Sequence, residues 1–261
     1  MINPRLKSLM EAISMENVVI PETNNLDEGE GTKTAGTSFI EDETDFWRID
    51  NVPYRNRIHS VCLAKTLLDT GSAKTQDEWA EYSRQAQQQE NFYVGDFPLY
   101  YSLSTQLHSL RENPGMKDIA EEVRQFISKQ MFEKWLMTLT RLQYKAAGKD
   151  TIVHNYGMPD RYGLNGNIKG KDGLITDAGI SARSMLELLT GENNPARVNE
   201  VYKWITGKET YLWRLNTTSQ DTERVAGFDA FSDGVGLDCN GNPENSNSAL
   251  GVRVARRAAQ N

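Results

Sequence analysis

The amino-acid sequence predicts an α+β fold, and three observations carry this prediction. Residues 117–147 show an apolar stripe at steps of three and four, which is typical of an amphipathic helix. Residues 235–240 and 250–255 instead alternate apolar with small or polar residues, as half-buried strands do. The composition changes near residue 148, where Gly, Asn and Asp become frequent. We therefore expect a mainly helical region over residues 1–147 and a strand-rich region over residues 148–261, which can also form one continuous domain.

The first half is expected to consist mainly of helices. Thr75 is followed by Glu78 at the spacing of a capping box, which marks a helix start. Gly148 is placed to end the long apolar stripe. The polar and acidic residues 21–37 are expected to form a loop. The helices expected in this half cover residues 1–16, 60–68, 75–90, 98–111 and 117–147.

The second half is expected to hold shorter elements. Two helices end at Gly191 and Gly207, residues that commonly follow the last turn of a helix. A loop rich in Gly, Asn and Asp is expected over residues 156–173. The helices are expected over residues 181–189 and 195–205, and the strands over residues 151–154, 210–215, 235–240 and 250–255.

Composition and charge exclude several functional classes. The 261 residues include 36 acidic and 29 basic side chains, giving a net charge of −7 without a basic tract, so no nucleic-acid partner is expected. No apolar run reaches about 18 residues, so no membrane span is expected. The N-terminus lacks the apolar core of a secretory signal. These features are compatible with the cytoplasm, a virion or non-standard export.

Motifs for catalysis and for metal or phosphate binding are absent or incomplete. The sequence contains no G-x-S-x-G motif and no phosphate-binding loop. His59 and Cys62 have a ligand-like spacing but lack a second pair of zinc ligands. Residues 165–176 place a Lys where a calcium loop needs an oxygen ligand. His108 and His154 lie on separate segments, so they are interpreted as structural. We therefore expect no catalysis, no cofactor and no metal.

The most unusual segment is residues 238–248, which contains four asparagines in eleven residues. In the preceding strand, Val235, Leu237 and Cys239 are expected to face the core, because they alternate with small and polar residues. A solvent-exposed loop is the simplest interpretation. A binding surface is the alternative, and its candidate positions are Ser232, Asp233, Gly236, Asp238, Asn240, Asn242, Glu244, Asn245 and Asn247.

The C-terminal residues also resemble a known family. The matching segments are Tyr211-Leu-Trp-Arg-Leu-Asn216, Gly227-Phe228, Gly234-Val-Gly-Leu237, Cys239 and Leu250-Gly-Val-Arg-Val254. They look like the C-terminal part of the variable proteins of diversity-generating retroelements, especially the archaeal and viral ones. The resemblance implies a C-type-lectin-like fold with short, mainly antiparallel strands, preceded here by a helical region. In that family, adenine-specific mutagenesis rewrites the gene end, and template asparagine codons then yield Asn, Asp, Ser and Gly among other residues.

The resemblance implies a ligand-binding protein with a hypervariable C-terminal surface and no enzymatic activity. Its partner would be a macromolecule, either a protein or a cell-surface component. Two alternatives stay open. One is an enzyme of the formylglycine-generating type, although that family uses two cysteines near the C-terminus and this chain has only Cys239 there. The other is an invariant structural protein of a phage or a cell surface.

Overall fold

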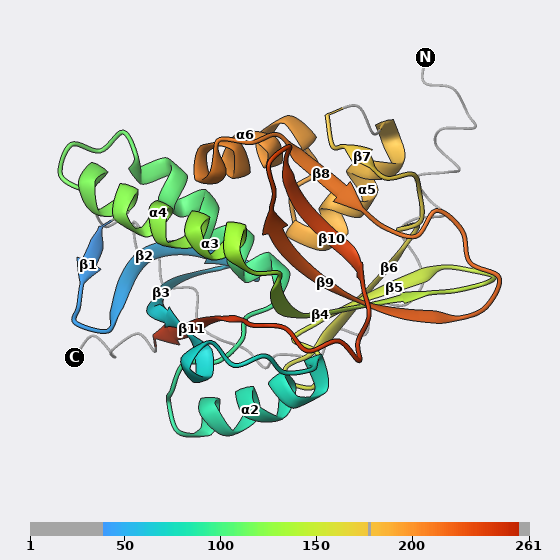
Figure 1. The fold of residues 1–261 in the computed structure, drawn as a ribbon, viewed down its shortest axis with the longest axis horizontal. Helices are drawn as coiled ribbons and strands as arrows, with labels where there is room; N and C mark the ends of the chain where they lie inside the picture. Colours follow the sequence, from blue (N-terminus) through green and yellow to red (C-terminus); the bar gives the residue numbers. More distant parts are fainter. Residues whose placement is uncertain (1–38, 177–178, 256–261) are drawn as a thin grey trace, which may run out of the picture. The chain divides into compact units, whose positions relative to one another are not determined.

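The computed structural model describes residues 39–176 and 179–255 (Figure 1). The helix expected over residues 1–16 and the loop expected over residues 21–37 lie outside the described residues. The described part contains helices and two β-sheets of mostly antiparallel strands, which confirms the α+β class. The described residues belong to one compact unit, and the expected boundary near residue 148 lies inside it.

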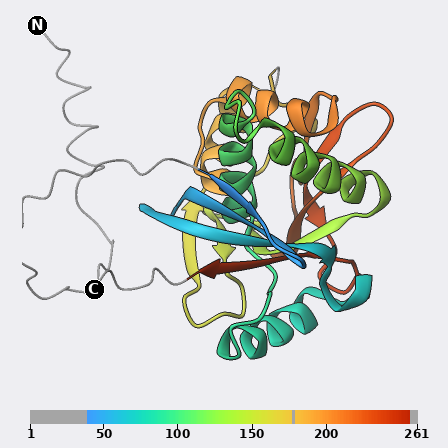
Figure 2. The same ribbon diagram turned by 90° about the vertical axis from the view of Figure 1, so that its left-hand side faces the viewer.

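The first sheet has four antiparallel strands in the order β1-β2-β3-β11. Their bounds are Ile40–Asp42 for β1, Phe46–Tyr54 for β2, Arg57–Leu67 for β3 and Leu250–Ala255 for β11. The last strand therefore pairs with a strand from the beginning of the described chain. Figures 1 and 2 both show β11 running beside β3.

The second sheet has seven strands in the order β6-β5-β4-β9-β10-β8-β7. Their bounds are Leu136–Tyr144 for β4, Asp150–His154 for β5, Tyr162–Gly166 for β6, Gly173–Leu174 for β7, Thr210–Trp213 for β8, Thr222–Ala230 for β9 and Val235–Gly241 for β10. β8 and β10 are parallel, and the other pairs are antiparallel. Consequently β10, which carries several candidate positions, lies inside the sheet between β8 and β9.

Helices cover these sheets unequally. The helices are α2 (Gln76–Gln88), α3 (Phe97–Leu110), α4 (Lys117–Glu133), α5 (Gly179–Thr190) and α6 (Pro195–Thr206), with a 3-10 turn η1 over Leu68–Gly71. Figure 1 shows α2 well apart from the other four. The expected capping box at Thr75 is present, and Gly207 ends α6 in the left-handed conformation with φ of 77°.

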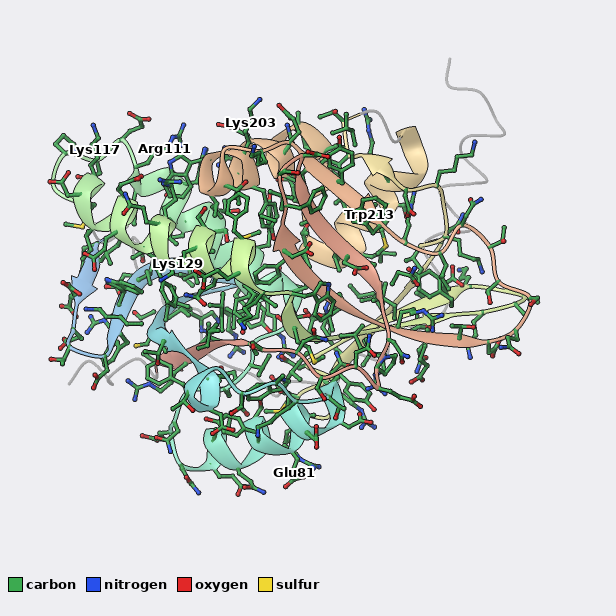
Figure 3. The ribbon with its side chains drawn as sticks, in the orientation of Figure 1. Glu81, Arg111, Lys117, Lys129, Lys203 and Trp213 are labelled. Atoms are coloured by element: carbon green, nitrogen blue, oxygen red, sulfur yellow. The ribbon has the colours of Figure 1, made fainter. Side chains whose placement is uncertain are left out.

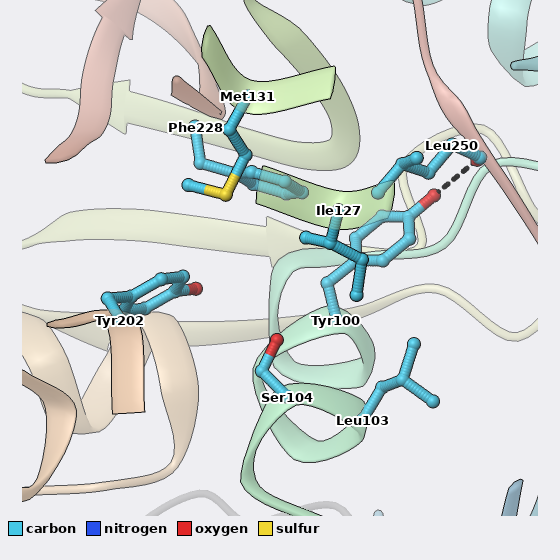
Figure 4. Close-up of a pocket in the computed structure, with 8 residues that line it drawn as sticks. All are labelled: Tyr100, Leu103, Ser104, Ile127, Met131, Tyr202, Phe228 and Leu250. Carbon is cyan, nitrogen blue, oxygen red and sulfur yellow. Dashed lines mark hydrogen bonds between the residues drawn. The ribbon is translucent and has the colours of Figure 1, made fainter. Parts of the chain in front are cut away.

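Two clusters of buried side chains hold the fold together. The larger one joins both sheets to α3, α4, α5 and α6. The smaller one lies under α2 and contains Trp79, Met137 and Leu139. A cavity of about 10 Å³ remains in the larger cluster beside Tyr100, whose hydroxyl donates a 2.7 Å hydrogen bond to the carbonyl of Leu250 (Figure 4). Such a space holds one water molecule at most.

Several expected elements are confirmed and three are wrong. The helices expected over residues 75–90, 98–111, 181–189 and 195–205 are present, as are the four expected strands. Residues 60–68 were expected to be helical but form most of β3, because β2 and β11 pair with both of its edges. The loop expected over residues 156–173 contains β6.

The long helix expected over residues 117–147 is also wrong in its second half. α4 ends at Glu133, and Lys134 is already extended with φ of −143° and ψ of 146°. Residues 136–144 continue as β4, which is buried almost throughout because the two clusters cover its two faces. A strand buried on both faces has apolar residues at nearly every step, so it matches a helical stripe as readily as a helix does.

Candidate functional site

The strands β8, β9 and β10 present one buried face and one open face. The buried face carries Leu212, Phe228, Val235, Leu237 and Cys239, each at most 3% exposed. This arrangement confirms the expected inward direction of the apolar residues of β10.

We call the opposite face of these strands the outer face. Its residues are Tyr211, Trp213, Gly227, Asp229, Gly236 and Asp238. The strand register brings them together: Gly236 pairs with Tyr211 and Asp229, and Asp238 pairs with Trp213 and Gly227. Paired residues of neighbouring strands point to the same side of a sheet. Trp213 is 38% exposed (Figure 3), so the outer face is open to solvent at β8.

Aromatic rings lie over glycines of the outer face and of the turn that precedes β10. A Cβ atom at Gly227 would be 2.4 Å from the ring of Trp135, and one at Gly234 would be 2.5 Å from the ring of Tyr211. Trp213 stacks beside Tyr211, with ring centroids 6.3 Å apart and an interplanar angle of 19°. Because these glycines have no side chains, large aromatic rings can lie directly against the backbone.

Two carboxylates lie among these rings. A Cβ atom at Gly236 would lie 2.4 Å from Oδ1 of Asp229. Because glycine has no Cβ, the Asp229 carboxylate occupies this space. Asp238 accepts a 3.0 Å hydrogen bond from Nε1 of Trp135 and a 2.7 Å hydrogen bond from the backbone N–H of Asn240.

Both carboxylates have raised pKa values. Burial, followed by the charge of Asp238, raises the pKa of Asp229 to about 6. Burial also raises the pKa of Asp238. Among the described residues, no Lys, Arg or His lowers either pKa or forms an ion pair with either group. The outer face therefore concentrates negative charge beside exposed aromatic surface.

The nine candidate positions are not gathered into one surface. Ser232 and Asp233 are exposed in the turn that precedes β10. Asn242, Glu244 and Asn245 are exposed in the turn that follows it. β10 has seven residues, so the two turns lie roughly 20 Å apart at opposite ends of one strand.

Gly236 and Asp238 lie between these turns on the outer face, whereas Asn240 departs from it. The register shifts between Asp238 and Gly241, and the alternation of β10 ends there. Asn240 is exposed at this irregularity, and its side-chain oxygen accepts a 2.9 Å hydrogen bond from Nε of Arg224. The expectation that Gly236, Asp238 and Asn240 share one regular face is therefore wrong for Asn240.

Asn247 has a structural role. Its backbone exchanges two hydrogen bonds with Lys74, of 3.0 and 2.9 Å, just before α2 begins. Its carbonyl also accepts a 2.7 Å hydrogen bond from Nε1 of Trp79. The connection between β10 and β11, which belong to different sheets, is thereby anchored to α2.

Sequence reasoning missed Trp135, Trp213 and Asp229 as members of the site. Trp135 falls within the apolar stripe that predicts a helix over residues 117–147, and Asp229 lies in a segment without a distinctive motif. A signal did exist in the sequence, because aromatic residues alternate over residues 211–213 while glycines alternate over residues 234–236. Only the pairing of β8 with β10 shows that the two patterns meet.

A second candidate site is a surface cavity of about 520 Å³ at the end of β11. The guanidinium of Arg253, from the closing Gly-Val-Arg segment, lies beside the adjacent rings of Phe46 and Phe92, 5.4 and 5.3 Å from their centroids. Glu43 and Glu90 also line this cavity, so its charges are mixed. These contacts explain the segment as a structural closure of the first sheet.

The remaining titratable candidates are structural. The ring nitrogens of His154 contact Oγ1 of Thr140 at 3.0 Å and the carbonyl of Leu188 at 2.9 Å, and burial lowers its pKa to about 4. Cys239 is fully buried, and burial raises the pKa of its thiol well above the ordinary value. A buried thiol with a raised pKa is a poor nucleophile.

Comparison of the chain with protein-family models, curated proteins and solved structures finds no match in any of the three. Within residues 39–176 and 179–255, no helix is both long and apolar enough to cross a membrane. No group of three potential metal ligands occurs in the same residues. The assignment of function therefore rests on the geometry of the outer face and its flanking turns.

Proposed function

We propose that this protein binds a macromolecular ligand through its C-terminal surface, and that a diversity-generating retroelement diversifies this surface by adenine-specific mutagenesis. The proposal rests on the resemblance of residues 211–256 to the variable proteins of such elements. The mixed architecture with short, mostly antiparallel strands agrees with the C-type-lectin-like fold that the resemblance implies.

The observation that carries the proposal is the separation of folding from display between β10 and the turns that flank it. Val235, Leu237 and Cys239 are completely buried, whereas the polar residues that flank β10 are exposed. A surface that tolerates variation needs this division, because the side chains that change must not be the ones that hold the core. Aromatic or Arg substitutions at the exposed positions would supply binding energy.

Apart from Asn247, whose role is structural, we divide the candidate positions into two groups by their surroundings. Tolerance of many residue types is expected at the exposed positions Ser232, Asp233, Asn240, Asn242, Glu244 and Asn245. Gly236 and Asp238 are more constrained, because a side chain at Gly236 would displace Asp229 and because Asp238 accepts the Trp135 hydrogen bond. Variation at these two positions requires neighbouring groups to move.

The formylglycine-generating type of enzyme is the less favoured alternative. Such an enzyme needs an accessible pair of cysteines. Cys239 is fully buried on β10, while Cys62 is buried on β3, in the other sheet. Burial raises the pKa of both thiols, so neither has the environment of a reactive cysteine.

Population sequencing of the gene tests the proposal directly. The 3′ end, from the codon for Tyr211 onward, is compared among many members of one population. We expect substitutions confined to adenine positions of a nearby, near-identical template, together with a reverse transcriptase gene. An invariant 3′ end without a template copy would contradict the proposal.

A pair of displayed libraries tests the separation of folding from display. One library randomises the six exposed positions, and the matched control randomises the buried residues Val235, Leu237 and Cys239. Protease resistance of the displayed chain reports folding. We expect most members of the first library and few of the second to resist cleavage. Equal losses in the two libraries would show that the exposed turns are also part of the folding determinant.

A further inference from the structure

The charge and the aromatic surface of the outer face are complementary to a cation. Asp229 and Asp238 lie on neighbouring strands, two residue pairs apart in the register of β9 and β10. Trp213 is paired with Asp238 across β8 and β10 and exposes 38% of its surface. In the described part of the chain, neither carboxylate has a cationic partner.

We propose that the outer face binds an arginine side chain of a protein partner, with its guanidinium over Trp213 and its N–H groups directed at Asp229 and Asp238. This inference rests on the proposed function, because it names a chemical group of the macromolecular ligand that the C-terminal surface binds. It also assigns the recognition to residues contributed by β8 and β9 as well as β10.

The geometry around Gly236 supports this placement. A Cβ atom there would lie 2.4 Å from Oδ1 of Asp229, 3.4 Å from Cδ1 of Trp213 and 3.5 Å from its Nε1. The carboxylate and the indole therefore flank the same Cα atom. A flat group that stacks on an indole can donate sideways to an adjacent carboxylate, and this combination suits a guanidinium.

The hydrogen-bonding capacity of the two carboxylates differs. Each oxygen of Asp238 already accepts one hydrogen bond, Oδ2 from Trp135 and Oδ1 from the Asn240 backbone. Among the described residues, no side chain donates a hydrogen bond to the Asp229 carboxylate. Asp229 is therefore the principal acceptor for the incoming guanidinium, and Asp238 contributes mainly charge.

Arginine fits this face better than lysine does. An ammonium would supply charge, but it is compact and strongly hydrated. A guanidinium is planar, stacks on aromatic rings and presents several donors in one plane. The indole of Trp213, which is 38% exposed, is a flat aromatic group beside the carboxylates and can use this planarity.

A titration of the full chain tests the proposal with N-butylguanidinium as the probe. The indole N–H signals of the tryptophans are followed by ¹H–¹⁵N NMR, and Trp213→Phe identifies the Trp213 signal. We expect a saturable shift of that signal. N-butylurea has the same shape without the charge and should bind at least about tenfold more weakly, because it loses the charge-assisted hydrogen bonds.

Two matched variants complete the experiment. Asp229→Asn should weaken binding of N-butylguanidinium about tenfold, whereas Asp118→Asn, at an exposed acid in the first turn of α4, should leave it unchanged. The remaining backbone signals confirm that both variants are folded. Equal binding of the urea, or equal affinity of the two variants, would overturn the proposal. Neither outcome bears on adenine-directed variation of the gene, so failure of this proposal can be distinguished from failure of the proposed function.

Discussion

Nε1 of Trp135 donates a 3.0 Å hydrogen bond to Oδ2 of Asp238. The same indole is so close to Gly227 and Gly241 that Cβ atoms added there would lie 2.4 and 2.9 Å from its ring atoms. Trp135 directly precedes β4, two residues after α4 ends. One side chain therefore closes the outer face at its β4 edge and fixes a carboxylate of β10.

This arrangement predicts that Gly227→Ala destabilises the protein. The added methyl group would overlap the ring of Trp135 and lie 2.7 Å from the carbonyl of Leu136, and the backbone cannot easily retreat. We expect a loss of about 2 kcal/mol in the free energy of unfolding, measured by urea denaturation. Gly163→Ala is the control, since its Cβ would meet its nearest neighbour at 3.5 Å. Equal losses of stability in the two variants would show that the ring of Trp135 moves aside at little energetic cost.

Gly236→Ala is expected to be coupled to Asp229. Alone, the substitution should cost about 1 kcal/mol, because the new methyl group displaces a side chain rather than backbone. In an Asp229→Ala background the space is already free, so the cost should vanish. A double-mutant cycle of unfolding free energies measures this coupling. Additive effects would mean that Gly236 is required for some reason other than room for Asp229.

The raised pKa of Asp229 predicts a pH dependence of stability. Burial holds its pKa near 6 in the folded chain, above the ordinary 3.8, so the folded state binds the proton more tightly. The contribution of this group to stability therefore falls as the pH rises from 3.8 to about 6. Asp229→Asn removes the titrating carboxyl group, so this loss of stability with rising pH does not occur in the variant.

The variant should accordingly be more stable than the parent at neutral pH, by about 1 kcal/mol after allowance for solvent screening. The stability advantage of the variant should disappear at about pH 4, where Asp229 is protonated in the parent. Thermal unfolding at several pH values measures the difference between the two proteins. Asp233→Asn serves as the exposed control, and an advantage that does not change with pH would contradict the pKa assignment.

Asp96 is expected to be among the most sensitive polar positions of the core. It is completely buried, its Oδ1 caps α3 by accepting from the Leu99 N–H at 3.0 Å, and its Oδ2 accepts from the Tyr54 hydroxyl at 2.8 Å. Asp96→Ala removes the cap and leaves a buried hydroxyl without its acceptor. We expect a loss of about 3 kcal/mol.

The matched control is Asn194→Ala, which removes the cap of α6 at an exposed position. It should cost about 1 kcal/mol, because water replaces the lost hydrogen bond there. Chemical denaturation followed by circular dichroism compares the two variants. If both substitutions cost the same, the buried hydrogen bond with Tyr54 contributes little beyond the cap.

The secondary structure was predictable where the signal is local. The capping box of Thr75 and Glu78 and the glycine that ends α6 act within one turn of helix, so their residues alone predicted the helix ends. β3 and β4 were mistaken for helices, because their buried runs owe their conformation to strands distant in the sequence. Periodicity cannot distinguish such a strand from a helical stripe.

The sequence by itself determined the alternation of β10, with Val235, Leu237 and Cys239 inward, because side-chain direction in a strand follows from a period of two. It also indicated that the polar residues after β10 lie in a solvent-exposed loop. Only the tertiary structure decided that Trp135, Trp213 and Asp229 meet around the glycines of the outer face. Strand pairing between distant segments created that site, and pairing depends on packing of the whole core rather than on any local pattern.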